Sequence, residues 1–215
     1  MKNFDGIIFD IDGTLTATNE LIFATFRHVA HKYLNRTVSD EEIIALFGPT
    51  EDVILKELMK DDYDAARKDY LDYYEEQHHS MADMYPGIKE ILHFIKSKNV
   101  LLSIYTGKGR GSSEITLKKI GVYDLFDMVV TGDDIEGHKT SPEGVTVFLE
   151  KFGLNPDRVL MVGDAPADVF AAHNSGIKIA SVLWDSYAKE KVLQMKSDYF
   201  FETVKDFRKF LEENL

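Results

Sequence analysis

Four short apolar runs, each ending at a polar turn that contains glycine, constrain the fold of this chain more than any other feature. The runs cover residues 6–10, 100–105, 128–131 and 159–162. Runs of this length that are rich in β-branched residues and stop at turn residues are typical of buried strands. A further strand is expected at residues 177–183 and a weaker one near 199–201. The sequence therefore predicts a sheet built from short, buried strands.

Helical patterns fill the segments between these strands. Apolar residues recur at spacings of three and four in residues 88–95 and again in residues 145–152, which end at Gly153. From residue 84 onward strand and helix alternate, which predicts an α/β fold with a Rossmann-like, doubly wound parallel sheet. Crossovers in such sheets are right-handed, and binding sites form at the carboxyl ends of the strands. The polar turns are therefore expected to meet at one edge of the sheet.

Residues 17–81 break this alternation, because they show only helical periodicity. The segment Ser39–Glu42 has the pattern of a capping box at the start of a helix. We expect an all-helical cap domain at residues 17–81, inserted into an α/β core formed by residues 1–16 and 82–215. The two connections, near residues 16–19 and 81–85, are expected to act as hinges.

The chain is strongly acidic, with 37 Asp and Glu against 25 Lys and Arg and a net charge of −12. This charge repels nucleic-acid backbones and anionic membranes at long range. The first apolar run is short and is broken by Asp10 and Asp12, so it indicates neither a signal peptide nor a membrane span. Cysteine is absent, which fits a reducing compartment and leaves oxygen or imidazole as the metal ligands. We expect a cytoplasmic protein whose anionic substrate needs locally placed cations.

Two carboxylates, Asp10 and Asp12, follow the first strand and are separated by one residue. In a strand they would share a face, and the turn at Gly13 lets both approach one point. Two carboxylates at one point need a cation or a shared proton. Considered alone, the pair could also be a strand end followed by a helix cap.

A second acidic pair, Asp164 and Asp168, follows the strand at residues 159–162 at a spacing of one helical turn. Carboxylates brought together from separate strand ends suit Mg²⁺, which prefers oxygen ligands. Thr106 and Gly107 end another strand and could bind phosphate oxygens, although glycine after a strand is often only a turn. Lys139 could neutralise phosphate charge, or it could simply be solvated.

These motifs, in this order and each after a strand, resemble the motif set of the haloacid dehalogenase superfamily of phosphatases over nearly the whole chain. The segment Asp10–Thr14 matches the family's first motif, and residues 163–168 match its acidic motif. Thr106 and Lys139 stand where the family has its hydroxyl and its lysine, and residues 17–81 resemble its helical cap. The run 106–108 is similar to the corresponding loop of phosphoglycolate and pyrophosphate phosphatases. The chain departs from the family where Thr140 replaces a frequent proline and Gly107 a frequent asparagine, which removes one side-chain donor near the phosphate.

The resemblance implies a mechanism as well as a fold. Asp10 would attack phosphorus to form an aspartyl-phosphate, and Asp12 would protonate the leaving oxygen and then deprotonate water. Mg²⁺ would be held by the Asp10 carboxylate, the Asp12 carbonyl and Asp164. Thr106, Gly107 and Lys139 would stabilise charge on the phosphoryl oxygens, with Asp168 positioning Lys139 or a metal-bound water.

The resemblance also implies that the cap closes over the site and contacts the leaving group. Candidate contacts are Thr16, Asn19, the break from Phe47 to Thr50, Lys108 and Arg110. Phe47 could instead belong to the cap core, and the two basic residues could form a solvated turn. The expected partner is a small phosphate ester, such as phosphoglycolate, a sugar phosphate, a nucleotide or pyrophosphate. The protein is expected to be a monomer or a homodimer.

Two other functions stay open on the sequence. A phosphomutase on the same framework, similar to beta-phosphoglucomutase, would keep Asp10 and Asp12 but return the phosphate to the substrate. A catalytically silent binding protein would lack one of the acidic positions, yet all of them are present. Dehalogenation is disfavoured because it has no leaving alkoxide for Asp12 to protonate.

Overall fold

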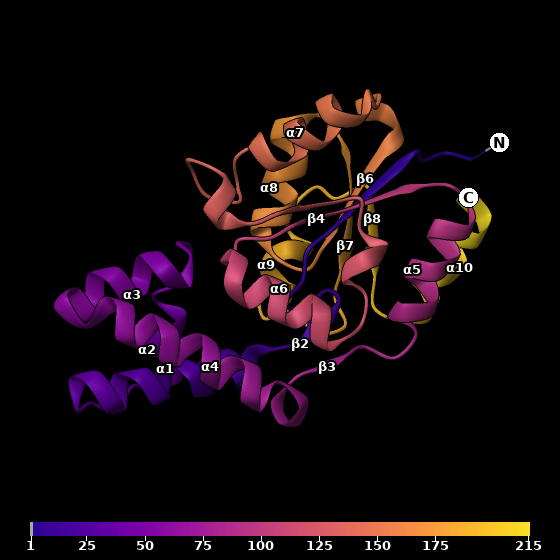
Figure 1. Cartoon of the computed structure of the whole chain (residues 1–215). Helices are drawn as coiled ribbons and strands as arrows, with labels where there is room; N and C mark the ends of the chain where they lie inside the picture. The colour runs from indigo at the N-terminus through magenta and orange to yellow at the C-terminus, as the bar shows by residue number, and fades with distance from the viewer. Residues whose placement is uncertain (1) are drawn as a thin grey trace.

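A six-stranded parallel sheet forms the centre of the molecule in a computed structural model that describes residues 2–215 (Figure 1). Its strand order is β5-β4-β1-β6-β7-β8, and every neighbouring pair is parallel. The strands are β1 (Gly6–Phe9), β4 (Leu101–Tyr105), β5 (Met128–Val130), β6 (Val159–Gly163), β7 (Lys178–Val182) and β8 (Tyr199–Phe201). The predicted α/β fold with a doubly wound parallel sheet is confirmed.

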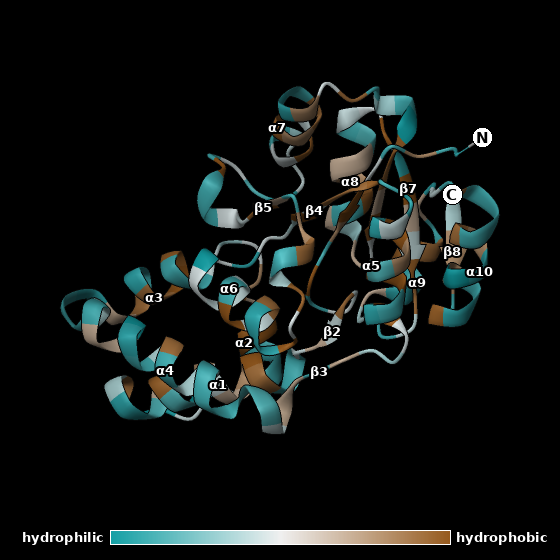
Figure 2. Cartoon of the chain, turned by 45° about the vertical axis from the view of Figure 1, so that its right-hand side comes forward, coloured by the Kyte–Doolittle hydropathy of each residue, from teal (hydrophilic) through white to brown (hydrophobic). Residues whose placement is uncertain are grey.

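Helices cover both faces of this sheet. The core helices are α5 (Ile88–Ser97), α6 (Arg110–Lys119), α7 (Glu143–Phe152), α8 (Pro166–Ser175), α9 (Lys189–Leu193) and α10 (Val204–Asn214). Side chains from α5, α6 and α10 pack on one face, and side chains from α7, α8 and α9 pack on the other. Figure 2 shows the resulting gradient, with hydrophobic strands at the centre and hydrophilic outer faces on the helices.

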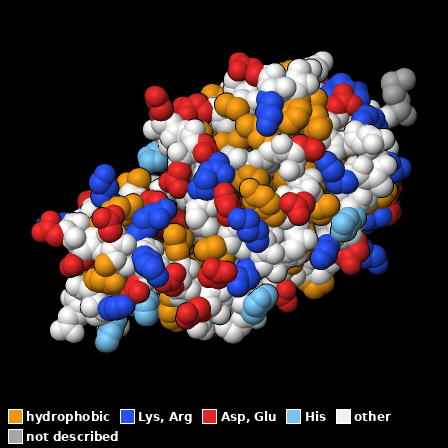
Figure 3. Space-filling view, in the orientation of Figure 1, with side chains coloured by type: hydrophobic (Ala, Val, Ile, Leu, Met, Phe, Trp, Pro, Cys, Tyr) orange, Lys and Arg blue, Asp and Glu red, His pale blue; other side chains and the backbone are white. Residues whose placement is uncertain are grey.

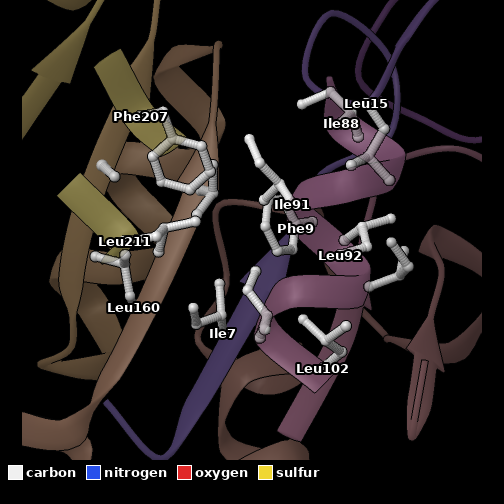
Figure 4. Close-up of a cluster of buried hydrophobic side chains, with 14 of the residues drawn as sticks. Ile7, Phe9, Leu15, Ile88, Ile91, Leu92, Leu102, Leu160, Phe207 and Leu211 are labelled. Atoms are coloured by element: carbon white, nitrogen blue, oxygen red, sulfur yellow. The ribbon is translucent and has the colours of Figure 1, made fainter. Parts of the chain in front are cut away.

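Successive side chains of β1 point to opposite faces of the sheet, so this strand contributes to both halves of the core. Ile7 and Phe9 point into the layer formed with α5 and α10, and Ile8 points into the opposite layer. Figure 4 shows the first layer, where Phe207 and Leu211 of α10 lie across the strand from the isoleucines of α5. Burying an Ile, Leu or Phe side chain stabilises the fold by about 1.5–3 kcal/mol. Because β1 is buried on both faces, the position of its carboxyl end is firmly fixed.

Four α-helices between residues 19 and 81 form a separate group at the lower left of Figure 1. They are α1 (Asn19–Leu34), α2 (Asp40–Ile44), α3 (Glu51–Met59) and α4 (Tyr63–Met81). Their apolar faces enclose a cluster of their own, in which Phe26 and Tyr70 meet edge to face at 5.2 Å. The predicted capping box at Ser39 and Glu42 starts α2. We call these four helices the cap; their standing as a domain with the predicted boundaries stays a prediction.

Two short strands join the cap to the sheet, β2 (Thr16–Ala17) and β3 (Asp83–Met84). They pair antiparallel, with Thr16 opposite Met84 and Ala17 opposite Asp83. The sequence predicts hinges at these connections but no strands, because two-residue segments are too short to show a pattern.

The surface mixes charges of both signs, as the face in Figure 3 shows. Within residues 2–215, no helix has the length and apolar character needed to span a membrane.

Candidate active site

The carboxyl ends of β1, β4 and β6 meet on one edge of the sheet, as the alternation of strands and helices predicted. Asp10 follows β1, Thr106 follows β4 and Asp164 follows β6. Together with the cap they line a cavity of about 280 Å³. The residues around this cavity include Asp10, Asp12, Gly13, Thr106, Gly107, Lys108, Lys139 and Asp164.

Lys139 lies between two carboxylates at the bottom of the site. Its Nζ is 2.6 Å from Asp10 Oδ1 and 2.5 Å from Asp168 Oδ1, and all three side chains are nearly inaccessible to solvent. Burial would lower the pKa of the Lys139 ammonium, but the two carboxylates outweigh it and raise that pKa. Lys139 is therefore charged at neutral pH and available to an anion bound beside Asp10.

Burial has the opposite effect on the neighbouring carboxyl groups. It raises the pKa of Asp10 to about 6, against the attraction of Lys139 and with added repulsion from Asp168 and Asp12. Burial also raises the pKa of Asp164, and repulsion from Asp10 and Asp168 adds to the effect. The cluster therefore holds carboxylates whose mutual repulsion a further cation would relieve.

Asp168 is held in place from two sides. Its Oδ1 contacts Lys139, and its Oδ2 accepts a hydrogen bond from the backbone N–H of Ala165 at 3.0 Å. A Cβ at Gly163 would lie 2.0 Å from the Asp168 carboxyl carbon, so only glycine fits before Asp164. The family resemblance implied that Asp168 positions either Lys139 or a metal-bound water; the structure places it in contact with Lys139, and its role stays a prediction.

Asp12 sits higher in the cavity, towards the cap. The Lys108 ammonium lies 3.2 Å from its Oδ2, and the hydroxyl of Thr18 donates a hydrogen bond to its Oδ1. Lys108 is buried and lies 4.7 Å from the centre of the Tyr74 ring, a cation–π contact with the cap. Burial opposes the charge on Lys108, but Asp12 outweighs it and raises the pKa of the lysine.

The turn after Asp12 places Asp164 beside the first motif. Gly13 has a φ of +77°, which favours glycine, and a Cβ there would lie 2.5 Å from Asp164 Oδ2. The Thr14 hydroxyl donates to Asp164 Oδ1 at 3.2 Å. The first and last motifs thus fit together only without a side chain at residue 13.

The buried acidic cluster suits a divalent metal ion. Asp10, Asp164 and Asp168 each offer a carboxylate oxygen, and these oxygens lie within 4.8 Å of one another. Lys139 supplies the one positive charge that contacts this trio within the described residues, so the cluster has a surplus of two negative charges when all three carboxyl groups are ionised. An all-oxygen ligand set with that surplus fits Mg²⁺. Lys139 contacts both Asp10 and Asp168, whereas Asp164 has no cationic partner among the described residues and is the carboxylate of the three most available to an ion.

Thr106 and Gly107 follow β4, which lies on the other side of β1 from β6. The Thr106 hydroxyl is buried and accepts a hydrogen bond from the Lys108 N–H at 3.3 Å. A Cβ at Gly107 would be 3.7 Å from the Lys139 Cβ, an ordinary contact. Space therefore does not require glycine at residue 107, and the open backbone can approach a ligand directly.

The structure brings together most, but not all, of the predicted leaving-group contacts. Asn19, Phe47 and Lys108 line the cavity. Thr16 is buried in β2, and its hydroxyl donates to the Ile11 carbonyl at 3.4 Å. Arg110 is directed away from the cavity, and its guanidinium forms an ion pair with Asp134. Neither Thr16 nor Arg110 lines the cavity.

Other cavity residues were not predicted from the sequence. They are Ile22, Phe26, Glu51, Ile54, Tyr70, Ala165, Ala167 and Tyr187. Gly48 and Pro49 also line the cavity, and they belong to the break at residues 47–50 that the sequence indicated as a contact. The apolar residues among them follow the helical periodicity that indicates burial, but periodicity does not say that their neighbour is an active site. Glu51 offered only the signal of an acidic residue in the first turn of a helix, which is common.

Known proteins share both the sequence and the fold. The sequence profile of haloacid dehalogenase-like hydrolases matches residues 7–182. The pyrophosphatase PpaX of Bacillus velezensis is 32% identical over 205 residues, which cover 95% of each chain. A crystal structure described as a predicted phosphoglycolate phosphatase from Haemophilus somnus superposes with a TM-score of 0.83 at 24% identity, covering 98% of this chain and 99% of that one. A candidate beta-phosphoglucomutase from Thermotoga maritima superposes with a TM-score of 0.77 at 25% identity, covering 99% and 100%.

The profile match spans the site from the first strand to the strand after Asp164. It therefore includes every motif that meets at the carboxyl edge of the sheet. On this evidence the chain belongs to the haloacid dehalogenase-like hydrolase family, as a phosphatase-type member with a doubly wound α/β core.

Proposed function

We propose that the chain is a Mg²⁺-dependent phosphohydrolase that cleaves a small phosphorylated metabolite through an aspartyl-phosphate on Asp10. The observation that carries the proposal is the placement of Asp10, buried at the end of β1 and 2.6 Å from the Lys139 ammonium. A carboxylate with a fixed cation beside it and an open cavity in front of it is suited to nucleophilic attack on an anionic group. The family relationship supports the same assignment.

In this mechanism the Asp10 carboxylate attacks phosphorus, and the leaving oxygen takes a proton from Asp12. Asp12 then removes a proton from the water that hydrolyses the aspartyl-phosphate. Lys139 and the backbone near Thr106 and Gly107 stabilise the phosphoryl oxygens. When bound, Mg²⁺ reduces the repulsion between the carboxylate nucleophile and the phosphate.

The contacts of Asp12 support its role as the proton carrier. Lys108 and the Thr18 hydroxyl hold its carboxylate at the boundary between the core and the cap, where a leaving group would emerge. The cap then excludes bulk water and contacts that group. We propose residues 17–81 as the cap domain and the β2–β3 pair as its hinge.

The first test measures phosphate release from a panel of phosphate esters and pyrophosphate, with and without Mg²⁺. Replacing Asp10 by Asn keeps the shape of the side chain but removes the nucleophile. Asp10→Asn should therefore reduce the metal-dependent rate by about 1,000-fold or more. Asp124→Asn, at an exposed position on the same domain, is the matched control and should keep full activity.

The same time course separates the hydrolase from the phosphomutase. Appearance of an isomerised phosphate ester without free phosphate would favour the mutase, a possibility raised by the similarity to the Thermotoga maritima protein. A folded native chain that releases no phosphate from any compound would refute the hydrolase assignment.

A further inference from the structure

The cavity has two chemically different halves. The core half carries the carboxylates and lysines described above. The cap half is mostly apolar, and it is formed by Ile22, Phe26, Phe47, Pro49, Ile54 and Tyr70. These residues come from α1, α3, α4 and the α2–α3 connection, and together they form one apolar wall. The wall faces the place where a leaving group would lie.

Few positive charges are available to that leaving group. Among the described residues that line the cavity, the basic ones are Lys108 and Lys139. Lys139 is engaged by Asp10 and Asp168 at the phosphoryl position. Lys108 already faces Asp12 at 3.2 Å. No cation therefore remains beyond Lys108 to balance a second anionic group.

Glu51 adds a negative charge to the cap half instead. It is 7% exposed, and its carboxylate accepts hydrogen bonds from the Gly109 N–H at 2.8 Å and from the Ser112 hydroxyl. These bonds hold the carboxylate in place where the cap meets α6. An anionic leaving group would have to lie near this carboxylate and the apolar wall, and burying charge without a partner is costly.

We infer, on the basis of the proposed function, that the preferred substrate is a phosphate monoester of a small, uncharged alcohol with a largely hydrocarbon skeleton. The alcohol lies against Phe26, Phe47 and Ile54, and Lys108 lies near the bridging oxygen. Pyrophosphate and 2-phosphoglycolate, whose leaving groups are anionic, are poorer substrates. The volume of about 280 Å³ lies at the small end of ligand cavities, which limits the alcohol to a few carbons.

The test compares kcat/KM for ethyl, butyl and hexyl phosphate with kcat/KM for pyrophosphate, 2-phosphoglycolate and glycerol phosphate, all with Mg²⁺. The activated ester p-nitrophenyl phosphate measures phosphatase activity independently of which leaving group the cavity prefers. We expect kcat/KM to increase from ethyl to butyl phosphate. Butyl phosphate should exceed pyrophosphate and 2-phosphoglycolate by at least about tenfold.

A preference for pyrophosphate or 2-phosphoglycolate, with p-nitrophenyl phosphate hydrolysed, would overturn the inference and leave the phosphatase assignment intact. Failure to hydrolyse every compound, p-nitrophenyl phosphate included, would overturn the phosphatase assignment and the inference with it. The two failures are therefore distinguishable.

Phe47→Ala tests the wall directly. Phe47 is 38% exposed, so its truncation should leave the cap folded. The ratio of kcat/KM for butyl to ethyl phosphate should fall by about tenfold. Ile44→Ala is the matched control, because Ile44 lies three residues earlier, is 45% exposed and does not line the cavity. An unchanged ratio in Phe47→Ala would show that the wall does not contact the alcohol.

Discussion

At the scale of single residues, the site concentrates buried negative charge and compensates only part of it. One ammonium, that of Lys139, contacts Asp10 and Asp168 but not Asp164, and burial raises the pKa of both Asp10 and Asp164. Such an arrangement is unfavourable for folding and useful for binding a cation. The effect on stability and the effect on metal binding can be separated by changing one carboxylate.

Asp164→Asn should stabilise the metal-free protein, because it removes one buried charge while its side-chain oxygen can still accept the bond from Thr14. A gain of about 1 kcal/mol would raise the midpoint of thermal unfolding by roughly 2–4 °C. Mg²⁺ should raise the midpoint of the native protein, but that of Asp164→Asn much less. Thermal unfolding with and without Mg²⁺ measures both effects. Equal stabilisation of the two proteins by Mg²⁺ would exclude Asp164 as a ligand.

His78, in the last turn of α4, makes folding depend on pH. It is 1% exposed, and no partner among the described residues contacts its Nε2. Burial, together with repulsion from Lys108, lowers the pKa of the imidazole to about 4. Below about pH 6.5 the imidazole is protonated in the unfolded chain but stays neutral in the folded chain. The folded state therefore loses stability as the pH falls from 6.5 towards 4.

Between pH 7 and pH 5 this residue should lower the free energy of unfolding by about 1–2 kcal/mol. In the His78→Phe variant, the free energy of unfolding measured with urea should fall by about 1–2 kcal/mol less between pH 7 and pH 5 than it does in the native protein. His79→Phe alters the adjacent, exposed histidine and should behave like the native protein. Parallel pH profiles for all three proteins would contradict the assignment.

At the scale of elements, α3 and α6 are joined across the cap boundary by one side chain. Glu51, in the first turn of α3, accepts the Gly109 N–H and the Ser112 hydroxyl at the start of α6. These are donors at a helix N-terminus, where a carboxylate is favourable. The same contact positions the α2–α3 connection that carries Phe47.

Glu51→Ala should therefore affect both stability and substrate binding. The buried donors lose their acceptor, at a cost of about 1–3 kcal/mol in the free energy of unfolding. KM for the preferred ester should rise by a larger factor than kcat falls, because the apolar residues of the cap are no longer held in position against the core. Glu57→Ala, on an exposed position of the same helix, is the control. A change in stability with no change in KM would confine Glu51 to a structural role.

The elements of the core could be predicted from the sequence, whereas the wall of the cavity could not. The strands ending at Asp10 and Asp164 are short, apolar and buried on both faces, so their pattern has few alternatives. The catalytic turns follow from the rule that parallel strands end at one edge. Phe26 and Ile54 fit the helical spacing of buried apolar residues, and this spacing is the same whether they face other cap residues or a ligand. Arg110 closely follows Thr106 and Gly107 in the sequence, yet its guanidinium, at the start of α6, forms an ion pair with Asp134.

At the scale of the whole molecule, the site exists only while the cap lies against the core. Lys108 contacts Tyr74, Glu51 contacts Gly109, and Tyr74 shares a hydrogen bond of 2.9 Å with Thr116. If the cap opens as proposed, substrate enters and product leaves when these contacts are released. Opening and closing should therefore be visible in the exchange of backbone amides at the boundary.

Orthovanadate, which resembles a phosphoryl group in transfer, should favour the closed state. Hydrogen exchange of residues 106–113 and of β2 and β3 should slow in its presence with Mg²⁺. The amides of β7 and α10, which lie away from the cap, serve as the internal reference. Equal exchange with and without orthovanadate would indicate a cap that does not move on this timescale.

The antiparallel pairing of β2 with β3 has a consequence for building new proteins from this one. Because Ala17 and Asp83 lie opposite each other, the chain leaves the core and returns to it at almost the same point. A two-residue Asn-Gly turn between them would close a hairpin, and neither the sheet nor the carboxylates of Asp10 and Asp164 would have to shift. The cap could therefore be replaced as a unit. Another helical module with adjacent ends could be inserted at this point, and the proposed phosphatase would then accept a different alcohol as the leaving group.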